Sequence, residues 1–330
     1  MIRKTSLSLG LLLLTFFTVC NEASANQNAS LPKVIEINNI AQNPEGIEFN
    51  KNDNTFLLSS LNAGPIIKVS PDGNYTAFSS GEKFPLSTAG IHIDYKHNRL
   101  LAASFNGLEI MDTDPATKGV SFLRIYNLST GVLEKQVILS SLVPDAATYF
   151  ANDVTVDEQG NAYVSDWYAQ VIYKVTLDGK ATVFWKNNTG IASGINGLDY
   201  HKDGYLLASL LSVNKKGVYT DYALVKIPLN NPKSAKQVSI DDAHFRGFDG
   251  MIIDANNEVI GVTNNGKSPG GNLLAKLKSD DNWKSAKVIK VKSMKPSTTV
   301  ASTPENRNYV IHQDFTDNAK TTWEIEEIKF

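Results

Sequence analysis

Residues 150–166, FANDVTVDEQGNAYVSD, decide the fold. Apolar and polar residues alternate in the first part of this stretch. An acidic turn that contains glycine follows from Asp157 to Gly160, and a second apolar run ends at Asp166. Short alternating runs separated by such a turn are typical of a β-hairpin. The stretch therefore predicts two antiparallel strands.

The hairpin pattern recurs along the chain. Aligned on their turns, the copies begin 44 to 63 residues apart, at Glu45, Ala89, Asn152, Asn196, Asp249 and Thr298. This period is typical of β-propeller blades joined by loops of variable length. Helical periodicity is weak throughout, so the sequence predicts an all-β, six-bladed β-propeller. We expect residues 26–42 to form an arm that adds a strand to the last blade and closes the ring.

The N-terminus has the features of a secretory signal. Arg3 and Lys4 are basic, residues 9–19 are almost wholly apolar, and Ala23-Ser24-Ala25 is a small-x-small cleavage site. The sequence thus predicts a signal peptide over residues 1–25, a propeller domain over 26–330, and a secreted or periplasmic protein. A lipid anchor on Cys20 is the less favoured alternative, because the bulky Val19 precedes it. No later stretch has the roughly 20 apolar residues of a membrane span.

Composition excludes several classes of function. Cys20 is the only cysteine and lies in the predicted signal peptide, so the mature chain has neither a disulfide nor thiol chemistry. The formal net charge of −2 gives no sign of binding to nucleic acid or to an anionic membrane surface. Phosphate-loop and dinucleotide-binding motifs are missing, as is a spacing that supports a Ser-His-Asp triad. The expected partner is a small-molecule substrate.

The first residues of the six copies form the candidate site. In a propeller the first strand of each blade lines the central channel, so these residues face one another at one end of the ring, here called the top face. Four of them offer oxygen ligands, two carboxylates and two carboxamides: Glu45, Asn152, Asn196 and Asp249. Hard divalent cations prefer such ligands, whereas zinc usually takes imidazole or thiolate. The sequence predicts a central divalent-metal site, with Ca²⁺ expected and Mg²⁺ or Mn²⁺ as alternatives.

Turn chemistry is the alternative explanation, because Asn-Gly and Asp-Gly are common turn dipeptides. Two observations favour the metal site. The dipeptides precede apolar strands whose own turns lie downstream, at residues 157–160 and 201–204. Glu45 occupies the equivalent position in the first copy, and glutamate is not a turn former.

These residues resemble the metal-binding signature of the senescence marker protein / gluconolactonase / luciferin-regenerating enzyme family. The resemblance covers essentially the whole chain after residue 25 and is carried by Pro44-Glu45-Gly46, Asn152-Asp153, Asn196-Gly197 and Asp249-Gly250. It implies that Glu45, Asn196 and Asp249 hold the metal. Asn152 would be a fourth ligand or would position the substrate, and Asp249 would also act as general base or nucleophile.

The chain departs from the more distant paraoxonases in blade two. Those enzymes have a histidine where this chain has Ala89. His92 lies three positions further along, where strict strand alternation points it to the opposite face. We therefore expect His92 either to reach the substrate or to pack between blades. Asp153 is similar to a residue that binds a second, structural calcium in paraoxonases, but Gly46 at the partner position argues against a second ion.

Other candidates have a structural explanation beside a functional one. Asp166 at a strand end is expected to cap the next turn. Tyr149 and Phe150 form either the apolar wall of a pocket or part of the core. His244 and Arg246 are expected on a solvated loop. Specificity is expected in four loops, at residues 111–119, 144–150, 212–219 and 264–271.

The resulting hypothesis is a secreted, metal-dependent hydrolase of a lactone or related ester, with phosphotriester hydrolysis as a side activity. The metal would act as a Lewis acid on the carbonyl oxygen, and Asp249 would take a proton from the attacking water. The alternative is a non-catalytic propeller that binds a small molecule or a partner protein on its top face, because a fold does not determine function. The hydrolase needs Asp249, whereas a non-catalytic propeller should keep its ligand when Asp249 is replaced by alanine.

Overall fold

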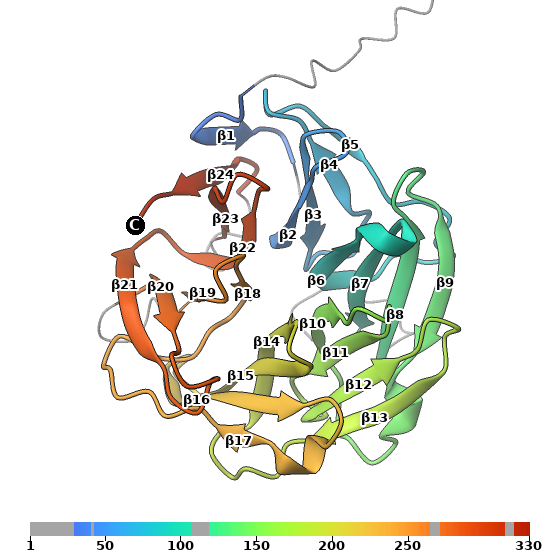
Figure 1. Ribbon diagram of the computed structural model, residues 1–330. Helices are drawn as coiled ribbons and strands as arrows, with labels where there is room; N and C mark the ends of the chain where they lie inside the picture. Colours follow the sequence, from blue (N-terminus) through green and yellow to red (C-terminus); the bar gives the residue numbers. More distant parts are fainter. Residues whose placement is uncertain (1–29, 41–42, 107–118, 265–270, 314–319) are drawn as a thin grey trace, which may run out of the picture.

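The structure, a computed structural model, describes residues 30–40, 43–106, 119–264, 271–313 and 320–330. The predicted signal peptide and Cys20 lie outside these ranges. Within them, six four-stranded antiparallel sheets follow one another around a central axis (Figure 1). The six-bladed β-propeller predicted from the repeat is confirmed. No helix in the described ranges is long and apolar enough to cross a membrane.

Each of the first three blades is a meander whose strands run from the axis outward. Blade one contains β2 (Pro44–Asn50), β3 (Thr55–Ser60), β4 (Ile67–Val69) and β5 (Tyr75–Ala77). Blade two contains β6 (Ser87–Asp94), β7 (Arg99–Asn106), β8 (Val120–Asn127) and β9 (Leu133–Ile138). Blade three contains β10 (Ala151–Val156), β11 (Ala162–Asp166), β12 (Val171–Val175) and β13 (Ala181–Lys186).

The later blades follow the same plan, except that blade six uses both ends of the chain. Blade four contains β14 (Gly194–His201), β15 (Tyr205–Val213), β16 (Tyr219–Pro228) and β17 (Lys236–Gln237). Blade five contains β18 (Met251–Ile253), β19 (Val259–Thr263), β20 (Leu273–Lys278) and β21 (Lys287–Ser293). Blade six contains β22 (Ser297–Ser302), β23 (Asn308–His312), β24 (Trp323–Ile328) and β1 (Val34–Ile37). Short 3₁₀ helices are η1 (Tyr95–His97), η3 (Ser140–Leu142) and η4 (Pro232–Ser234).

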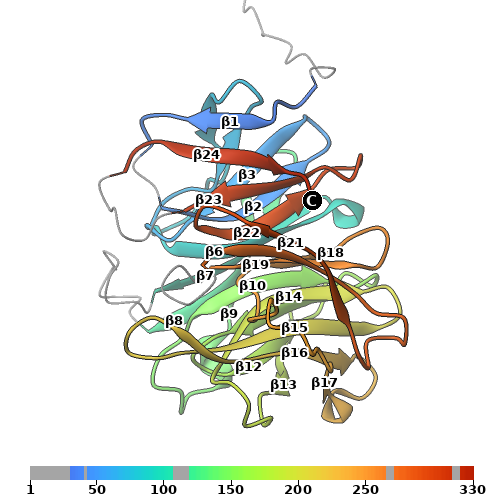
Figure 2. The same cartoon turned by 90° about the vertical axis from the view of Figure 1, so that its left-hand side faces the viewer.

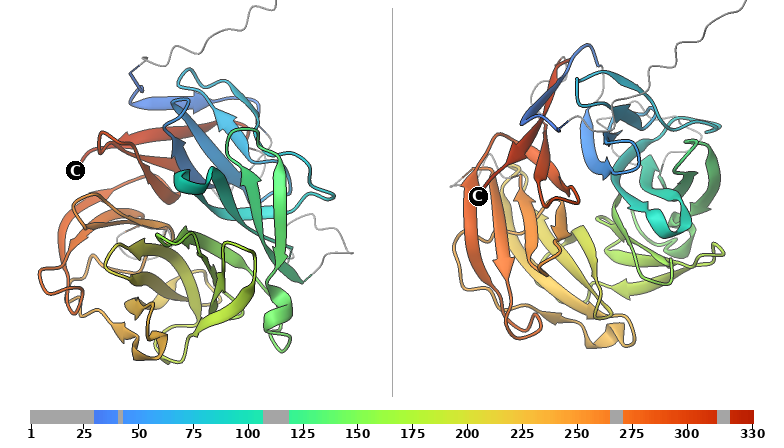
Figure 3. Two further views of the ribbon diagram at one scale, coloured as in Figure 1. Left: turned by 45° about the vertical axis from the view of Figure 1, so that its right-hand side comes forward. Right: turned by 45° about the horizontal axis from the view of Figure 1, so that its top comes forward.

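The N-terminal arm closes the ring, as predicted. Strand β1 pairs antiparallel with β24, with Ile35 opposite Ile325 and Ile37 opposite Trp323 (Figures 2 and 3). Both isoleucines of β1 are buried, at 2% and 0% exposure. Arg307 adds a link across the closure, because its guanidinium donates to the backbone oxygen of Leu31 at 3.0 Å. Closure therefore combines apolar burial with a strand ladder between the two ends of the propeller.

The hydrophobic core lies between blades rather than inside one. In one cluster Leu101 and Leu123 of blade two pack with Val154 and Val164 of blade three. The second strand of a blade is covered by a neighbouring blade on each face, so β3, β7, β11 and β19 are buried along their whole length. Outer strand β9 instead alternates between half-buried and exposed residues. The blades therefore stabilise one another across their faces.

A β-bulge marks the start of the innermost strands. In five blades the pairing with the second strand shifts register, between residues 44/47, 88/91, 151/154, 195/198 and 297/300. Two residues then oppose one, which turns the first of them away from strict alternation. In blade five the backbone N–H of Asp249 donates to Val262 O at 2.7 Å and Gly250 O accepts from Val262 N at 2.9 Å. The predicted site residues occupy these bulge positions.

The glycine after the bulge residue in blades one and four is required by close packing. A Cβ on Gly197 would lie 2.5 Å from the backbone oxygen of Asp249, and one on Gly46 would lie 2.5 Å from the backbone oxygen of Ala89. Both oxygens belong to the next blade around the ring. The Glu-Gly and Asn-Gly dipeptides are thus not hairpin turns, because their glycines let neighbouring innermost strands approach.

We expect Gly197→Ala to destabilise the protein by about 1–3 kcal/mol, because the added methyl group meets a backbone atom that cannot rotate away. Lys202→Ala, on the exposed turn of the same hairpin, is the control and is expected to change stability by less than about 0.5 kcal/mol. Thermal unfolding of the purified variants measures both effects. Equal unfolding temperatures for the two variants would contradict the close-packing argument.

Candidate metal centre

Four innermost strands bring the predicted ligands to the axis. Glu45, Asn152, Asn196 and Asp249 stand at equivalent bulge positions and are 7%, 5%, 3% and 9% exposed. The bulge explains the burial, since it turns a polar side chain inward at the start of an otherwise apolar strand. Interactions within the set join Asn196 to Asp249 and Glu45 to Asp249, whereas Asn152 is placed with them by its equivalent bulge position.

A hydrogen bond joins two members of the set. The Nδ2 of Asn196 donates to Oδ1 of Asp249 at 2.9 Å. This contact leaves Oδ1 of Asn196 buried and without a hydrogen-bond partner among the described residues. An unpaired buried acceptor costs about 1–3 kcal/mol. A cation in the channel would satisfy that oxygen.

The two carboxyl groups repel each other in a buried setting. Burial raises the pKa of Glu45 well above its ordinary value, and the negative charges of Asp249 and Asp153 raise it further. Burial also raises the pKa of Asp249 to about 7, although hydrogen bonds from Asn196 and Asn264 oppose the shift. In the described ranges neither carboxylate has an ion-pair partner.

The donor set fits a hard divalent cation. Two buried carboxylates and the unpartnered carboxamide oxygen all favour a positive charge between them. Among the described residues, no three His, Cys, Asp or Glu side chains gather as a metal site. An ion at this centre would therefore depend on the oxygens of Asn152 and Asn196 as well as on the carboxylates.

The remaining two ring positions offer no free ligand. Thr298 is fully buried, and its hydroxyl donates to the backbone oxygen of Glu45 at 2.6 Å. Ala89 is also fully buried and belongs to an apolar cluster with Leu61 and Phe105. The polar side chains of the centre consequently come from blades one, three, four and five, whereas blade two contributes an apolar surface.

Tyr219, outside the predicted ligand set, lies near enough to the centre for the charges of Asp249 and Glu45 to act on it. It begins β16, whose pairing with β15 extends to Val213 and forms the hairpin of the two longest described strands. Burial raises the pKa of Tyr219 well above its ordinary value, and the charges of Asp249 and Glu45 add to the shift. The phenol thus remains a neutral donor. The sequence indicated only a variable loop at 212–219, and no local pattern marks this residue.

His92 lies in the channel in contact with Glu48, not on the opposite face. Its Nδ1 is 3.3 Å from Oε1 of Glu48. Burial lowers the pKa of His92, but the hydrogen bond to Glu48 and the charges of Glu48, Asp199 and Asp153 outweigh burial and raise it to about 9. The pair joins blade two to blade one, so the expected packing of His92 between blades is confirmed, although the bulge at residues 88/91 interrupts the strict alternation assumed for it. A contact of His92 with substrate stays a prediction.

Asp153 connects blades three and four. Its carboxylate accepts hydrogen bonds from the backbone N–H groups of Leu198 and Val154, each at 2.8 Å. Burial raises the pKa of Asp153 to about 7, and these bonds oppose the shift. The side chain is thus engaged with the neighbouring strand.

The weaker candidates have structural roles. Asp166 accepts from the backbone N–H groups of Phe150 and Ala169, each at 3.0 Å, so the predicted cap is confirmed. His244 is exposed and pairs with Asp242 at 2.8 Å on the loop before blade five. Tyr149 is buried in the core between blades two and three, whereas Phe150 is half-buried.

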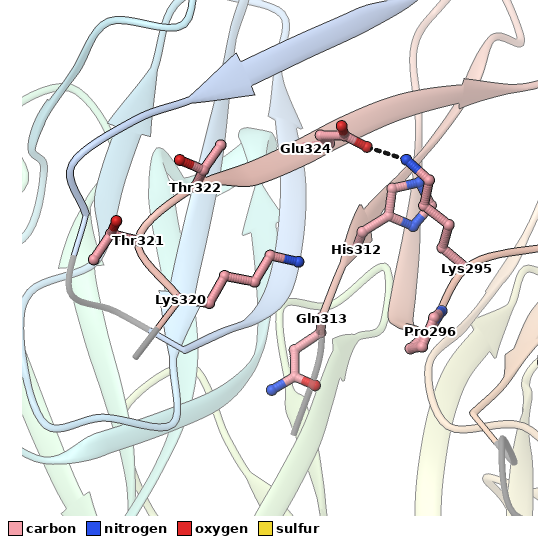
Figure 4. Close-up of a pocket in the computed structure, with 8 residues that line it drawn as sticks. All are labelled: Lys295, Pro296, His312, Gln313, Lys320, Thr321, Thr322 and Glu324. Atoms are coloured by element: carbon pink, nitrogen blue, oxygen red, sulfur yellow. Dashed lines mark hydrogen bonds and ion pairs between the residues drawn. The ribbon is translucent and has the colours of Figure 1, made fainter. Parts of the chain in front are cut away.

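A cavity of about 590 Å³ lies on blade six, away from the candidate ligands (Figure 4). It is lined by Lys295, Pro296, His312, Gln313, Lys320, Thr321, Thr322 and Glu324. Lys295 and Glu324 form an ion pair on one of its sides, as the figure shows. The Nδ1 of His312 forms a hydrogen bond with Oγ of Ser297 at 2.8 Å, and its Nε2 forms one with Oε2 of Glu326 at 2.7 Å. Because Ser297 is fully buried, we interpret this series as structural.

Comparison with solved structures shows the same fold. The major Malassezia sympodialis allergen Mala s 1 superposes with a TM-score of 0.69 at 20% identity, over 91% of this chain and 97% of that one. A gluconolactonase from Xanthomonas campestris superposes with a TM-score of 0.59 at 12% sequence identity, over 89% of each chain. Regucalcin, a calcium-binding protein from Agrobacterium tumefaciens, superposes with a TM-score of 0.57 at 19% sequence identity, over 87% of this chain and 91% of that one. No curated protein sequence matches significantly.

The family model for the SMP-30/Gluconolactonase/LRE-like region matches residues 43–275. The match begins two residues before Glu45 and includes Asn152, Asn196 and Asp249, and it covers well over half of the 330 residues. The chain therefore belongs to the SMP-30/gluconolactonase/LRE-like family.

Proposed function

We propose that the chain is a secreted or periplasmic hydrolase of a lactone or related ester, and that it depends on a divalent cation held by Glu45, Asn152, Asn196 and Asp249. The observation that carries this proposal is the buried Glu45–Asp249 carboxylate pair beside the unpartnered oxygen of Asn196. Membership of a family that includes gluconolactonases supports the reaction class. Ca²⁺ is the expected ion, and the calcium-binding regucalcin of the same fold is consistent with that choice.

When bound, the cation supplies Lewis acidity toward the carbonyl oxygen of the substrate. Asp249 would act on the water. Asn196 fixes its Oδ1 with a hydrogen bond of 2.9 Å, and the carboxylate held in this way would accept the proton of the attacking water. Water adds to the carbonyl carbon, the ring C–O bond breaks, and the departing oxygen takes up a proton. The product is a hydroxy acid.

Tyr219 is a second group with a chemical role in this proposal. Because its pKa is raised, the phenol keeps its proton over the working pH range and can donate a hydrogen bond. A neutral donor beside two carboxylates suits the oxygen atoms of a lactone, on which negative charge develops during attack. Asn152 either completes the ligand set or orients the substrate, as the family resemblance implies.

Asp249→Ala should abolish lactone hydrolysis. We expect kcat/KM of this variant to fall by at least about 10²-fold, which is the range for loss of a general base. In the parent protein kcat/KM should depend on added Ca²⁺, Mg²⁺ or Mn²⁺. The measurement is turnover of a lactone panel with each cation and with a chelator. Asp221→Ala, at an exposed position of β16, is the matched control and should leave turnover unchanged.

Full turnover by Asp249→Ala would exclude this assignment of the base. Binding of a cation without turnover of any lactone would keep the metal centre and reject the substrate class. If the protein neither binds a cation nor turns over a lactone, the non-catalytic propeller becomes the better description.

The cation should stabilise the protein more at pH 8 than at pH 5. The folded-state pKa of Asp249 is raised from 3.8 to about 7, so without a cation stability declines as the pH rises through this interval and the buried groups ionise. The pKa of Glu45 is also raised, so its ionisation likewise lowers stability as the pH rises. At pH 8 a cation at 100 times its Kd adds about 2.7 kcal/mol to the free energy of unfolding. At pH 5 protons compete with the cation for the carboxylates, so it adds less.

Thermal unfolding with Ca²⁺ or with a chelator at the two pH values measures this effect. Asp249→Asn removes one titrating carboxyl group and should reduce the difference between the two values. An equal rise in unfolding temperature at pH 5 and pH 8 would show that these carboxyl groups do not hold the ion.

A further inference from the structure

The outer edges of neighbouring blades meet in different ways around the ring. Blades one and two are joined there by a parallel bridge between Ser80 and Val132, and blades four and five by one between Ser239 and Ser285. Each bridge ties the segment that follows one outer strand to the segment that precedes the next outer strand. These two junctions are thereby closed at the rim of the propeller.

The corresponding segments of blades three and four are not bridged. Residues 187–189 follow β13, and residues 232–235, which include η4, precede β17. The structure describes both segments, and no β-bridge or backbone hydrogen bond joins them. Strand β13 and helix η4 nevertheless lie side by side at the rim (Figure 1), and a cavity of about 550 Å³ lies between them. This volume is in the range of small-molecule sites.

Apolar side chains form a large part of the lining of this rim cavity. Val183, Phe184 and Trp185 come from β13, and Pro232 comes from η4. The pairing of β12 with β13 shifts register here, so Phe184 has no residue opposite it in the ladder. Its ring instead meets that of Tyr163 edge-on, at a centroid distance of 4.9 Å. The cavity therefore offers an aromatic surface that the neighbouring core holds in place.

The charged residues of the lining are both lysines. Lys186 ends β13 and Lys233 lies in η4, so the two come from opposite sides of the cavity. Both are exposed, and neither forms an ion pair with a described residue. No aspartate or glutamate is among the described residues of the lining. An anion that enters the rim cavity therefore meets two ammonium groups and no opposing carboxylate.

We propose that the rim cavity binds a small apolar carboxylate. Its aryl or alkyl part lies against Phe184 and Trp185, and its carboxylate pairs with Lys186 and Lys233. The aromatic surface supplies contact area, and the two lysines supply complementary charge. The rim cavity is at the outer edge of the propeller, whereas the candidate metal centre is on the axis. The inference therefore does not depend on the proposed hydrolase.

Calorimetric titration of the protein with 2-naphthoate and with 2-naphthamide, its neutral analogue, tests the proposal. We expect the acid to bind about three- to tenfold more tightly than the amide, which is the range for two exposed ion pairs. High salt should reduce this preference, because it screens exposed charges. Acetate, which lacks the apolar part, should show no measurable binding. Equal affinity for the acid and the amide would overturn the assignment of a carboxylate.

Variants of the two lysines locate the site. Lys186→Ala combined with Lys233→Ala should remove the preference for the acid and leave the affinity for the amide unchanged. Lys290→Ala is the matched control, because Lys290 is an exposed lysine on β21, the outer strand of blade five. It should change neither affinity. An undiminished preference for the acid in the double variant would overturn the proposal.

Variants of the apolar lining test the other half of the ligand. Phe184→Ala should weaken the acid and the amide alike, by about tenfold, because both place the same ring system against it. Val183 is 39% exposed, so its variants keep the test decisive if Phe184→Ala does not fold. Val183→Glu adds a negative charge to the lining and should weaken the acid by about tenfold relative to the amide. Val183→Gln, similar in size but uncharged, should keep the preference for the acid.

Capture of the carboxylate by a cation at the candidate metal centre is the competing explanation. The titration with 2-naphthoate is therefore repeated with a chelator, at a temperature at which the protein stays folded. Unchanged affinity would support the rim cavity. Loss of binding would assign the ligand to the metal centre and overturn the inference.

Discussion

The close approach of the six innermost strands around the axis is the constraint on which the rest of the structure depends. A glycine follows the bulge residue in four blades, and in blades three and six Asp153 and Thr299 occupy its place. Ser165 adds a polar bridge at this level, since its hydroxyl accepts from Asp153 N at 3.0 Å and donates to Asn196 O at 2.9 Å. Backbone geometry and hydrogen bonds between blades thus set the spacing of the candidate ligands.

Burial then determines the chemistry of the centre. Glu45 and Asp249 would be poor ligands in an open cleft, where water compensates their charge. In the narrow channel their negative charges oppose each other, and the proximity that raises their pKa values also favours a cation between them. The proposed metal binding would therefore follow from the burial of these two carboxylates.

Much of this arrangement could be predicted from the sequence. Acidic, glycine-containing turns at a regular period were sufficient for the propeller, and the phase of the repeat identified Asn196 and Asp249. The position of His92 could not be predicted, because a bulge changes alternation without a signal of its own in the sequence. Tyr219 was missed for a different reason: it reaches the centre through the unusual length of the blade-four hairpin. Features set by periodicity were thus predictable, and those set by local irregularity were not.

The pairing of β1 with β24 has a consequence for the order of assembly. Tyr309, for example, donates to the backbone oxygen of Pro32, 277 residues away along the chain. Contacts of such sequence separation form late and slow the folding of β-rich proteins. During synthesis the ring would stay open until the final strand leaves the ribosome.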